Sequence, residues 1–383
     1  MKTLIKLLLF LLLSVSLFNQ NILASEKIKI GLIVPLSGDN SLIGEKIIKS
    51  IRMAINKIND ERIEILPKDT KSNPIDALKA SKELYKEGVK IVIGPVFNES
   101  TKYLDDLEDV TFISFTNKLI DNPKNVISAG VNAISQLQTI KKFNDKKNLS
   151  RSIFLIPKSQ FKKEIEKAIN KTKIKHKKVF YYDREPTKLT KQIEELTKYQ
   201  LRKDNLKYEI KRIEGLSFKD KERRIQNLKK RDTLGNIDFD SVIITDFDEN
   251  LKSVATSLLY TDVSSKRISY ITLNQWFDES LLNENSLHPI YFPSINKVNY
   301  ELFMEDFKNI YGLEGDQLSF LSYDLMGLVY FLIYENNFNI SKKIFYKKNK
   351  FKGKIGIFEI SKNVVTHQLN FYSIENNKFK KIF

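Results

Sequence analysis

Cysteine is absent from the 383-residue chain, and histidine occurs three times. The lack of cysteine excludes disulfide bonds, thiolate metal sites and cysteine nucleophiles, and it excludes a lipid carried on an N-terminal cysteine. His176, His288 and His367 lie far apart in the sequence and show neither the spacing of a metal site nor that of a catalytic triad. A glycine-rich phosphate-binding motif is also missing. We therefore expect no cofactor, no metal and no enzymatic activity.

Arginine is scarce although the chain is strongly basic. The formal net charge is +17, and 10 of the 64 basic residues are arginine. Arginine is the side chain that makes bidentate contacts with phosphates and bases. Lysine is spread along the whole chain, as asparagine and isoleucine are, and does not form one basic segment. We therefore expect no nucleic-acid partner.

Residues 1–24 have the pattern of a secretory signal. Lys2 and Lys6 give a positive start, residues 7–13 are an unbroken apolar run, and Ala24 offers a cleavage point before Ser25. The alternative is an uncleaved anchor, for which the apolar stretch is short. We expect cleavage and a periplasmic location without a lipid anchor. The mature chain is expected to be free or held at the anionic membrane surface by its lysines, and no later segment is expected to span a bilayer.

The length and the apolar pattern predict two lobes, because 383 residues exceed a single compact core. Short apolar strands alternate with amphipathic helices, a pattern typical of parallel sheets covered on both faces. In a first unit the strands are expected at 28–36, 63–66, 90–93 and 110–115, and in a second at 153–156, 178–182, 241–245 and 268–273. Two helices at 300–311 and 318–334 and three strands at 354–360, 366–374 and 378–383 follow.

A long segment without strand signals, residues 188–232, interrupts the second unit. It carries 15 basic and 8 acidic residues, and its apolar residues recur at steps of three and four. This spacing predicts one or two amphipathic helices that protrude as a hairpin. The segment is either a solvated surface insertion or a docking arm for a partner protein or the membrane surface.

Polar side chains follow the predicted strands of the first unit. Ser37 follows the first strand, Phe97 and Asn98 follow the third, and Ser114 and Thr116 end or follow the fourth. Ligands of open α/β sheets bind outside the carboxyl ends of the strands. Hydroxyl, amide and backbone N–H groups at such positions suit a carboxylate or another polar head group. The alternative for each residue is plain helix capping.

Four segments carry a resemblance to a known family. They are IGLIVPLSGDNSLIGEKIIKSIRMAINKIND at 30–60, VIGPVFNES at 92–100, FISFTN at 112–117 and LSFLSYDLMGLVYFL at 318–332. Together they resemble the leucine-binding-protein family, the type I periplasmic binding proteins. Within that family the chain is most similar to penicillin-binding-protein activators. The shared features are LPKDT at 66–70, Phe97, the helical insertion and the residues 232–235 before the resumed strand.

The resemblance implies a periplasmic binding protein type I fold of class α/β. Two Rossmann-like lobes with parallel sheets would be joined by a three-segment hinge. The first lobe would hold 26–144 and 286–340, and the second would hold 145–285 and 341–383. In amino-acid-binding members the corresponding loops bind the carboxylate and ammonium groups of the ligand. Asn98, Ser114 and Thr116 match those positions.

The second unit departs from the amino-acid-binding members of the family. The loop after Ile156 contains Gln160 and lacks the usual Tyr-Gly pair. Asp246 follows the resumed strand and is expected to face a ligand ammonium. Trp276 follows the last strand of the unit and would cover an apolar side chain, or else serve as a hinge or core residue. Phe97 would fill part of the site.

Two functions fit this pattern. The first is a regulator that binds a cell-wall synthase, which the basic insertion favours. The second is the solute receptor of an ABC importer, which would bind a small amino-acid-like ligand and dock on a permease. Both use closure of the two lobes around a hinge, and fold alone does not choose between them.

Overall fold

The first lobe is built on a parallel sheet of five strands in the order β2-β1-β3-β4-β5. The computed structural model describes residues 27–383, so the expected secretory segment lies outside the described residues. The strands are β1 (Ile28–Val34), β2 (Ile63–Asp69), β3 (Ile91–Ile93), β4 (Thr111–Ser114) and β5 (Val126–Ser128). The inner strands β1, β3 and β4 are buried along most of their length, whereas β2, at the edge of the sheet, is partly exposed.

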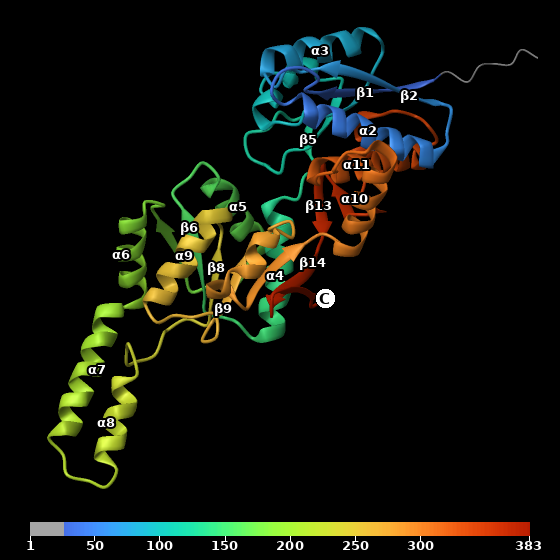
Figure 1. Ribbon diagram of the computed structural model, residues 1–383. Helices are drawn as coiled ribbons and strands as arrows, with labels where there is room; N and C mark the ends of the chain where they lie inside the picture. Colours follow the sequence, from blue (N-terminus) through green and yellow to red (C-terminus); the bar gives the residue numbers. More distant parts are fainter. Residues whose placement is uncertain (1–26) are drawn as a thin grey trace, which may run out of the picture.

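Helices cover both faces of this sheet. Helix α2 (Ser41–Ile58) packs with α11 (Gln317–Glu335) over one face, where Ile47 and Ile51 contact the core of β1. Helix α3 (Pro74–Lys86) covers the other face together with the short turns η1 (Asn98–Thr101) and η2 (Leu104–Leu107). Figure 1 shows the sheet between these helices.

The second lobe contains a mixed sheet in the order β15-β14-β10-β9-β8-β6-β7. Five of its strands are parallel, and β14 and β15 are antiparallel additions at one edge. One face packs against helices α4 and α5, and the other packs against α6 and α9. The strands are β6 (Ser152–Pro157), β7 (Lys178–Tyr182), β8 (Ser241–Ile244), β9 (Ser269–Thr272), β10 (Ile290–Ser294), β14 (Asn370–Glu375) and β15 (Lys378–Lys381). The helices are α4 (Ala133–Lys147), α5 (Lys162–Thr172), α6 (Pro186–Thr197) and α9 (Asp248–Tyr260), followed by the short turns η3 (Glu279–Asn283) and η4 (Asn285–Leu287).

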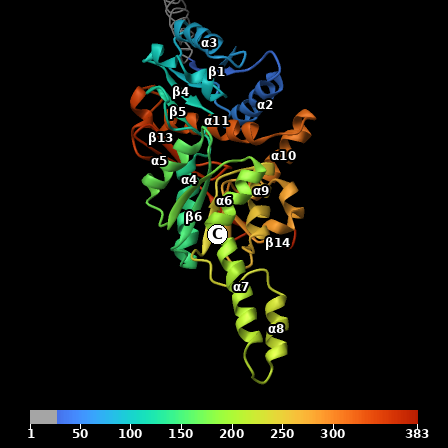
Figure 2. The same ribbon diagram turned by 90° about the vertical axis from the view of Figure 1, so that its left-hand side faces the viewer.

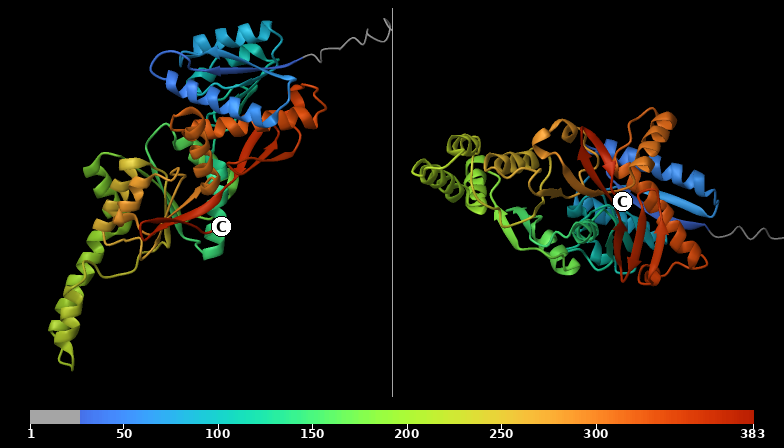
Figure 3. Two further views of the ribbon diagram at one scale, coloured as in Figure 1. Left: turned by 45° about the vertical axis from the view of Figure 1, so that its right-hand side comes forward. Right: turned by 90° about the horizontal axis from the view of Figure 1, so that it is seen from below.

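Three chain crossings join the lobes. They run from β5 to α4, from β10 to α10 (Lys297–Tyr311), and from β13 to β14. A small antiparallel sheet of β11 (Asn349–Lys352), β12 (Ile357–Ser361) and β13 (Val364–Gln368) follows the turn η5 (Lys342–Phe345). This sheet packs against α11, where the rings of Phe331 and Phe351 lie 5.6 Å apart. The two lobes and the crossings give the type I periplasmic binding protein fold that the sequence predicts (Figure 3).

The structure divides the chain between the lobes differently from the sequence-based boundaries at 145 and 286. Helix α4 packs against α5, so the second lobe begins before residue 145. Strand β10 pairs with β9 and β14, so residues 290–294 also belong to the second lobe. The sequence pattern of α4 or of β10 does not show to which lobe the element belongs, because an apolar strand or helix face can pack in the core of either lobe.

The sequence predicts that no segment after residue 24 is long and apolar enough to span a bilayer. By length and composition alone, however, helix α11 is long and apolar enough to cross a membrane. In the structure it is a core helix, and most of its apolar window is buried inside the protein. Its N-terminus is closed by a capping box between Asp316 and Ser319. The helix therefore serves as the central support of the first lobe and carries one wall of the cleft described below.

The basic insertion forms helices, as predicted, but only part of it protrudes. Helix α6 packs against α9, and its residues Leu189 and Ile193 are buried in the main core. Helices α7 (Tyr199–Glu214) and α8 (Lys221–Lys229) extend away from the second lobe as a hairpin (Figures 1 and 3). Residues 199–229 are called the hairpin from here on. It has a small core of its own, formed by Leu206, Ile213, Ile225 and Leu228.

Candidate functional site

A cavity of about 730 Å³ lies between the lobes at the carboxyl ends of their strands. The first lobe supplies the loops after β3 and β4 and the start of α11. The second lobe supplies the loops after β8 and β9 and Gln136 of α4. We call this cavity the cleft. Its lining includes Phe97, Asn98, Thr116, Asn117, Gln136, Phe247, Asp248, Asn274, Gln275, Trp276, Asp278, Gln317 and Leu321.

Four of the eight residues expected at a binding site line the cleft: Phe97, Asn98, Thr116 and Trp276. Asn98 and Thr116 stand together, since the Thr116 hydroxyl donates to the Asn98 side-chain oxygen at 3.5 Å. Thr116 Oγ1 also accepts from the backbone N–H of Lys118 at 3.2 Å. The loops after neighbouring parallel strands therefore meet as the sequence predicts, with two polar groups on one wall and Trp276 from the other lobe.

Three other expected residues do not line the cleft. Ser114 is fully buried, and its hydroxyl donates to the carbonyl of Pro95 at 2.8 Å. Ser37 donates to the Asp69 carboxylate at 2.5 Å, which joins the ends of β1 and β2. Gln160 is exposed on the loop between β6 and α5. In this structure Ser114 and Ser37 have structural hydrogen bonds, so their position after a strand does not by itself bring them to a ligand.

Asp246 is paired inside the protein and does not line the cleft, unlike its expected role. Its carboxylate accepts from Tyr182 Oη at 2.7 Å and from Arg184 Nη2 and Nε at 2.7 and 3.0 Å. Burial and the neighbouring Asp246 charge raise the pKa of the Tyr182 hydroxyl, which therefore stays a donor. With its oxygens occupied in this way, Asp246 has no position for a ligand ammonium.

The amide residues after β9 and on α4 are cleft residues that the sequence analysis missed. Asn274 Oδ1 accepts from Trp276 N at 3.0 Å and from Ser294 Oγ at 2.8 Å, which fixes the orientation of the amide. Its Nδ2 atom is buried and has no partner among the described residues. Gln136 Oε1 accepts from Asn274 N at 2.9 Å. Buried donors normally have partners, so this one marks a position for a ligand oxygen or a water.

The cleft is acidic although the protein is basic. Asp248 and Asp278 line it, and the residues that line it include no lysine or arginine. Asp278 also caps the turn η3 by accepting from Ser280 N at 2.9 Å. A negative field in a concave site favours a ligand with a positive group. The signal was available in the sequence, since both residues stand within six positions after strand ends.

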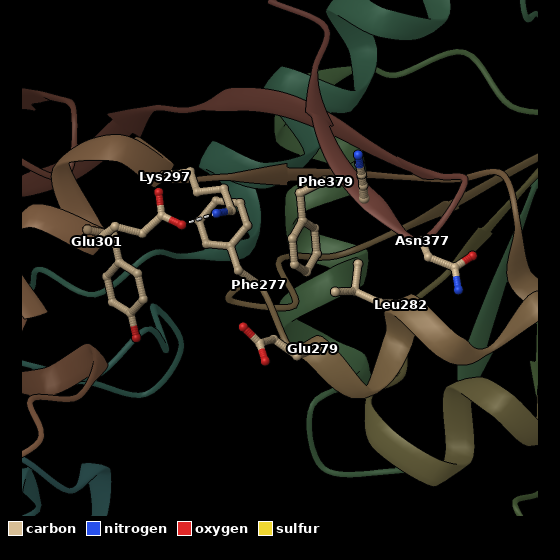
Figure 4. A pocket seen from close by; sticks show the side chains of 9 residues that line it. Phe277, Glu279, Leu282, Lys297, Glu301, Asn377 and Phe379 are labelled. Atoms are coloured by element: carbon tan, nitrogen blue, oxygen red, sulfur yellow. Dashed lines mark hydrogen bonds and ion pairs between the residues drawn. The ribbon is translucent and has the colours of Figure 1, made fainter.

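The loop after β9 places two adjacent aromatic rings in two different cavities. Trp276 and Phe277 have φ values of 50° and 60°, a left-handed conformation that is unusual for bulky residues. Trp276 lines the cleft, and Phe277 lines a neighbouring pocket of about 420 Å³. Figure 4 shows this pocket, in which Phe277 lies beside Phe379 and Lys297 pairs with Glu301. Such strain persists only where the surroundings impose it, so the loop is a fixed feature of the cleft.

Comparisons with known proteins agree with this architecture. Residues 27–176 match the family model described as periplasmic binding protein. The leucine binding protein LivK from Thermotoga maritima is 16% identical with a TM-score of 0.55, covering 93% of this chain and 98% of that protein. A putative branched-chain amino acid ABC transporter protein from Rhodospirillum rubrum is 11% identical with a TM-score of 0.71, covering 93% and 100%.

A third solved structure comes from a different functional class. The C-domain of LpoA from Haemophilus influenzae, a regulator of PBP1A, is 12% identical with a TM-score of 0.62, covering 93% of this chain and 100% of that domain. A comparison with curated protein sequences gives no match. The fold is thus shared by a leucine binding protein and by a regulator of PBP1A, and the identities are too low to choose between these two kinds of protein.

Proposed function

Since residues 27–176 match the periplasmic binding protein family and the described chain has the leucine-binding-protein fold, we propose that this protein is a non-catalytic periplasmic regulator. It would bind a cell-wall synthase and act through that contact. The hairpin is the observation that carries the proposal. The likeness to the LpoA C-domain supports the choice of partner, because that protein is a regulator of PBP1A with the same fold.

The surface of the hairpin suits a protein partner. Leu201, Tyr208, Leu216 and Phe218 are exposed to 57%, 71%, 43% and 40%. Residues 199–229 also include ten basic and five acidic residues. Exposed aromatic and aliphatic side chains with a charged rim are typical of interface hot spots. Leu216 and Phe218 stand two residues apart in the turn between α7 and α8, where such an exposed apolar pair is a candidate contact for a protein partner.

Substitution of Leu216 and Phe218 by serine should weaken binding to a purified cell-wall synthase at least tenfold. Truncation of a hot-spot side chain costs about 2 kcal/mol or more, and Leu216 and Phe218 lie together in the turn between α7 and α8. Val298 and Leu302 on α10 are the matched control, because they are exposed to 62% and 52% but lie away from the hairpin. Surface plasmon resonance with the double variants and with a deletion of 199–229 measures the effect. Unchanged affinity in the deletion would overturn the proposal.

The second candidate function, a solute receptor, is favoured by the cleft. A cavity of about 730 Å³ falls in the size range of small-molecule sites. The unpaired Asn274 Nδ2 would donate to a ligand oxygen, and Asp248 or Asp278 would face an ammonium group. A ligand with both groups is amino-acid-like, and the acidic lining favours a basic side chain.

Thermal-shift measurements decide between the two functions. A true ligand at 100 times its dissociation constant stabilises the protein by about 2.7 kcal/mol. A receptor should therefore give a clear rise in melting temperature with lysine or arginine, a smaller one with leucine and none with glutamate. Asn274→Leu should abolish the rise, while the Leu216→Ser/Phe218→Ser variant should keep it. Absence of any rise would remove the receptor function and leave the regulator.

A further inference from the structure

A second cavity of about 720 Å³ lies outside the cleft, where the two lobes and the small sheet meet. The loop 119–124 of the first lobe forms one wall, helix α5 of the second lobe forms another, and strands β12 and β13 form the third. Figure 2 shows β5, β13 and α5 in one vertical row at the left of the molecule. Six lysines line the cavity, which we call the lysine groove: Lys124, Lys167, Lys171, Lys348, Lys350 and Lys362.

The charge of the lysine groove is largely unbalanced. Glu359 is the one acidic residue in its lining, and it pairs with Lys350 at 2.9 Å. Lys167 donates to the backbone carbonyl of Leu119 at 3.0 Å. The other four lysines make no side-chain hydrogen bond or ion pair with the residues that the structure describes. Four exposed lysines, from the loop 119–124, helix α5 and the segment 348–362, therefore line one concave space, and their positive charge attracts anions to it.

The floor of the lysine groove is apolar. Val126, Ile134 and Ile360 line it and are themselves 7%, 6% and 1% exposed. Leu119 and Val364 continue the apolar surface towards the rim. A groove for an inorganic anion would need no such floor, and a purely apolar site would need no lysines. The combination fits a ligand that has an apolar body and an anionic head.

Two buried acceptors refine the class of ligand. The Oδ1 atoms of Asn122 and Asn363 are buried and have no hydrogen-bond partner among the described residues. Both residues line the groove. Asn122 Nδ2 donates to the carbonyl of Lys118 at 2.8 Å, which fixes its oxygen as the free acceptor. A ligand that also carries an amide N–H or a hydroxyl would satisfy these oxygens.

The groove is held open by contacts between the lobes. Glu164 of α5 is buried, and its Oε1 atom accepts from the backbone N–H groups of Leu119 and Ile120 at 2.9 and 2.7 Å. These bonds fix the loop 119–124 of the first lobe against the second lobe. A wall that is fixed before binding reduces the conformational cost of holding a ligand.

We propose that the lysine groove binds an amphipathic organic anion that carries a hydrogen-bond donor, with the chemistry of an N-acylated amino acid. The lysines hold the carboxylate, the isoleucine and valine side chains hold the acyl chain, and the amide N–H reaches an asparagine oxygen. The inference does not depend on the hairpin or on the cleft. Because both lobes and the small sheet line the groove, an occupant would also bridge the lobes.

Isothermal titration calorimetry of the full chain with N-octanoylglycine tests the proposal. We expect saturable one-to-one binding that weakens as salt is raised. The methyl ester lacks the charge and N-acetylglycine lacks the apolar chain, and each should bind at least tenfold more weakly. Equal binding of either compound would overturn the proposed ligand class. Binding only to vesicles with anionic lipid, and not to the monomeric probe, would overturn the groove as a site for a free molecule.

Matched lysine variants locate the binding. Replacing Lys124, Lys171 and Lys362 by glutamine should weaken binding at least tenfold. Replacing Lys79, Lys86 and Lys266, which are exposed elsewhere, should leave it unchanged. Trp276→Ala should also leave it unchanged, because Trp276 lines the cleft and not the groove. If the Trp276 variant loses binding or the groove variant keeps it, the probe binds elsewhere and the proposal is wrong.

Discussion

Replacing Arg202 by alanine should lower the free energy of unfolding by about 3 kcal/mol and release the hairpin from the second lobe. Arg202 lies near the start of α7 and is only 3% exposed. Its Nε donates to the carbonyl of Thr197 at 3.0 Å, and its Nη1 donates to Thr233 Oγ1 at 3.0 Å. Its Nη2 donates to the carbonyl of Thr261 at the end of α9. One guanidinium thus joins the base of the hairpin to the end of α6, to the segment after α8 and to the end of α9.

The size of the effect follows from what alanine leaves behind. Hydrogen bonds from a charged donor contribute about 1.5–3 kcal/mol, and the abandoned buried carbonyls lose their partners without gaining water. Asp262 does not add to the cost, because it keeps an ion pair with Arg267 at 2.8 Å. Loss of the long aliphatic stem of Arg202 removes packing as well. The three bonds end on three different segments, so their loss should loosen the direction of the hairpin more than its helicity.

Arg212→Ala is the matched control. Arg212 belongs to the same helix, is 45% exposed and pairs with Glu209 on the surface. Exposed pairs contribute at most about 1 kcal/mol, so this variant should unfold close to the wild type. Urea unfolding measures the difference, and hydrogen exchange of residues 199–229 reports the release of the hairpin. If both variants unfold alike, the anchor does not hold the hairpin in the way that its contacts indicate.

The sequence predicts the parts of this molecule whose physical cause is local. The helix expected at 318–334 is α11 at Gln317–Glu335, because its apolar pattern and its cap stand in adjacent residues. The strands expected at 153–156 and 241–245 are β6 and β8, because the apolar residues that form each strand are adjacent in the sequence. Strand β5 is not predicted from the sequence, because only two of its three residues are apolar, whereas the equally short β3 is apolar throughout and ends before Gly94.

The candidate site shows where local reasoning ends. The rule that ligands bind after parallel strands found Phe97, Asn98, Thr116 and Trp276, which line the cleft from both lobes. The same rule misplaced Asp246, because its partner Arg184 lies 62 residues earlier in the chain. Pairing between distant residues decides which polar groups stay free for a ligand. No spacing in a single sequence reports that pairing.

Taken by itself, protonation of His367, a residue of β13 beside the crossing to β14, should lower the free energy of unfolding in acid. His367 is 2% exposed, and both ring nitrogens lack a partner among the described residues. Burial lowers the pKa of His367 from 6.5 to about 4. Above pH 6.5 the ring is neutral in both states and contributes no pH dependence. Between pH 6.5 and 4 the imidazole of His367 is protonated in the unfolded chain but neutral in the folded chain. The free energy of unfolding therefore decreases as the pH is lowered.

The loss from His367 alone should reach about 3 kcal/mol at pH 4, since each unit of pKa difference is worth 1.36 kcal/mol. Asp324 opposes it. Burial raises the pKa of Asp324 from 3.8 to about 6 despite two backbone N–H donors, Lys354 and Ile355. The folded chain therefore holds a proton on Asp324 that the unfolded chain releases between pH 3.8 and 6. The Asp324 contribution to the free energy of unfolding thus rises as pH falls.

Because the two groups have opposite slopes, their contributions nearly cancel in the wild type between pH 6 and 4. His367→Phe removes one slope, so its unfolding free energy relative to the wild type should increase by about 3 kcal/mol between pH 7 and 4. Asp324→Asn removes the other and should make the chain more sensitive to acid, whatever its stability at neutral pH. Urea unfolding at pH 7, 6, 5 and 4 measures both differences. Parallel pH profiles for the wild type and His367→Phe would show that His367 gains a proton as easily folded as unfolded, contrary to its burial.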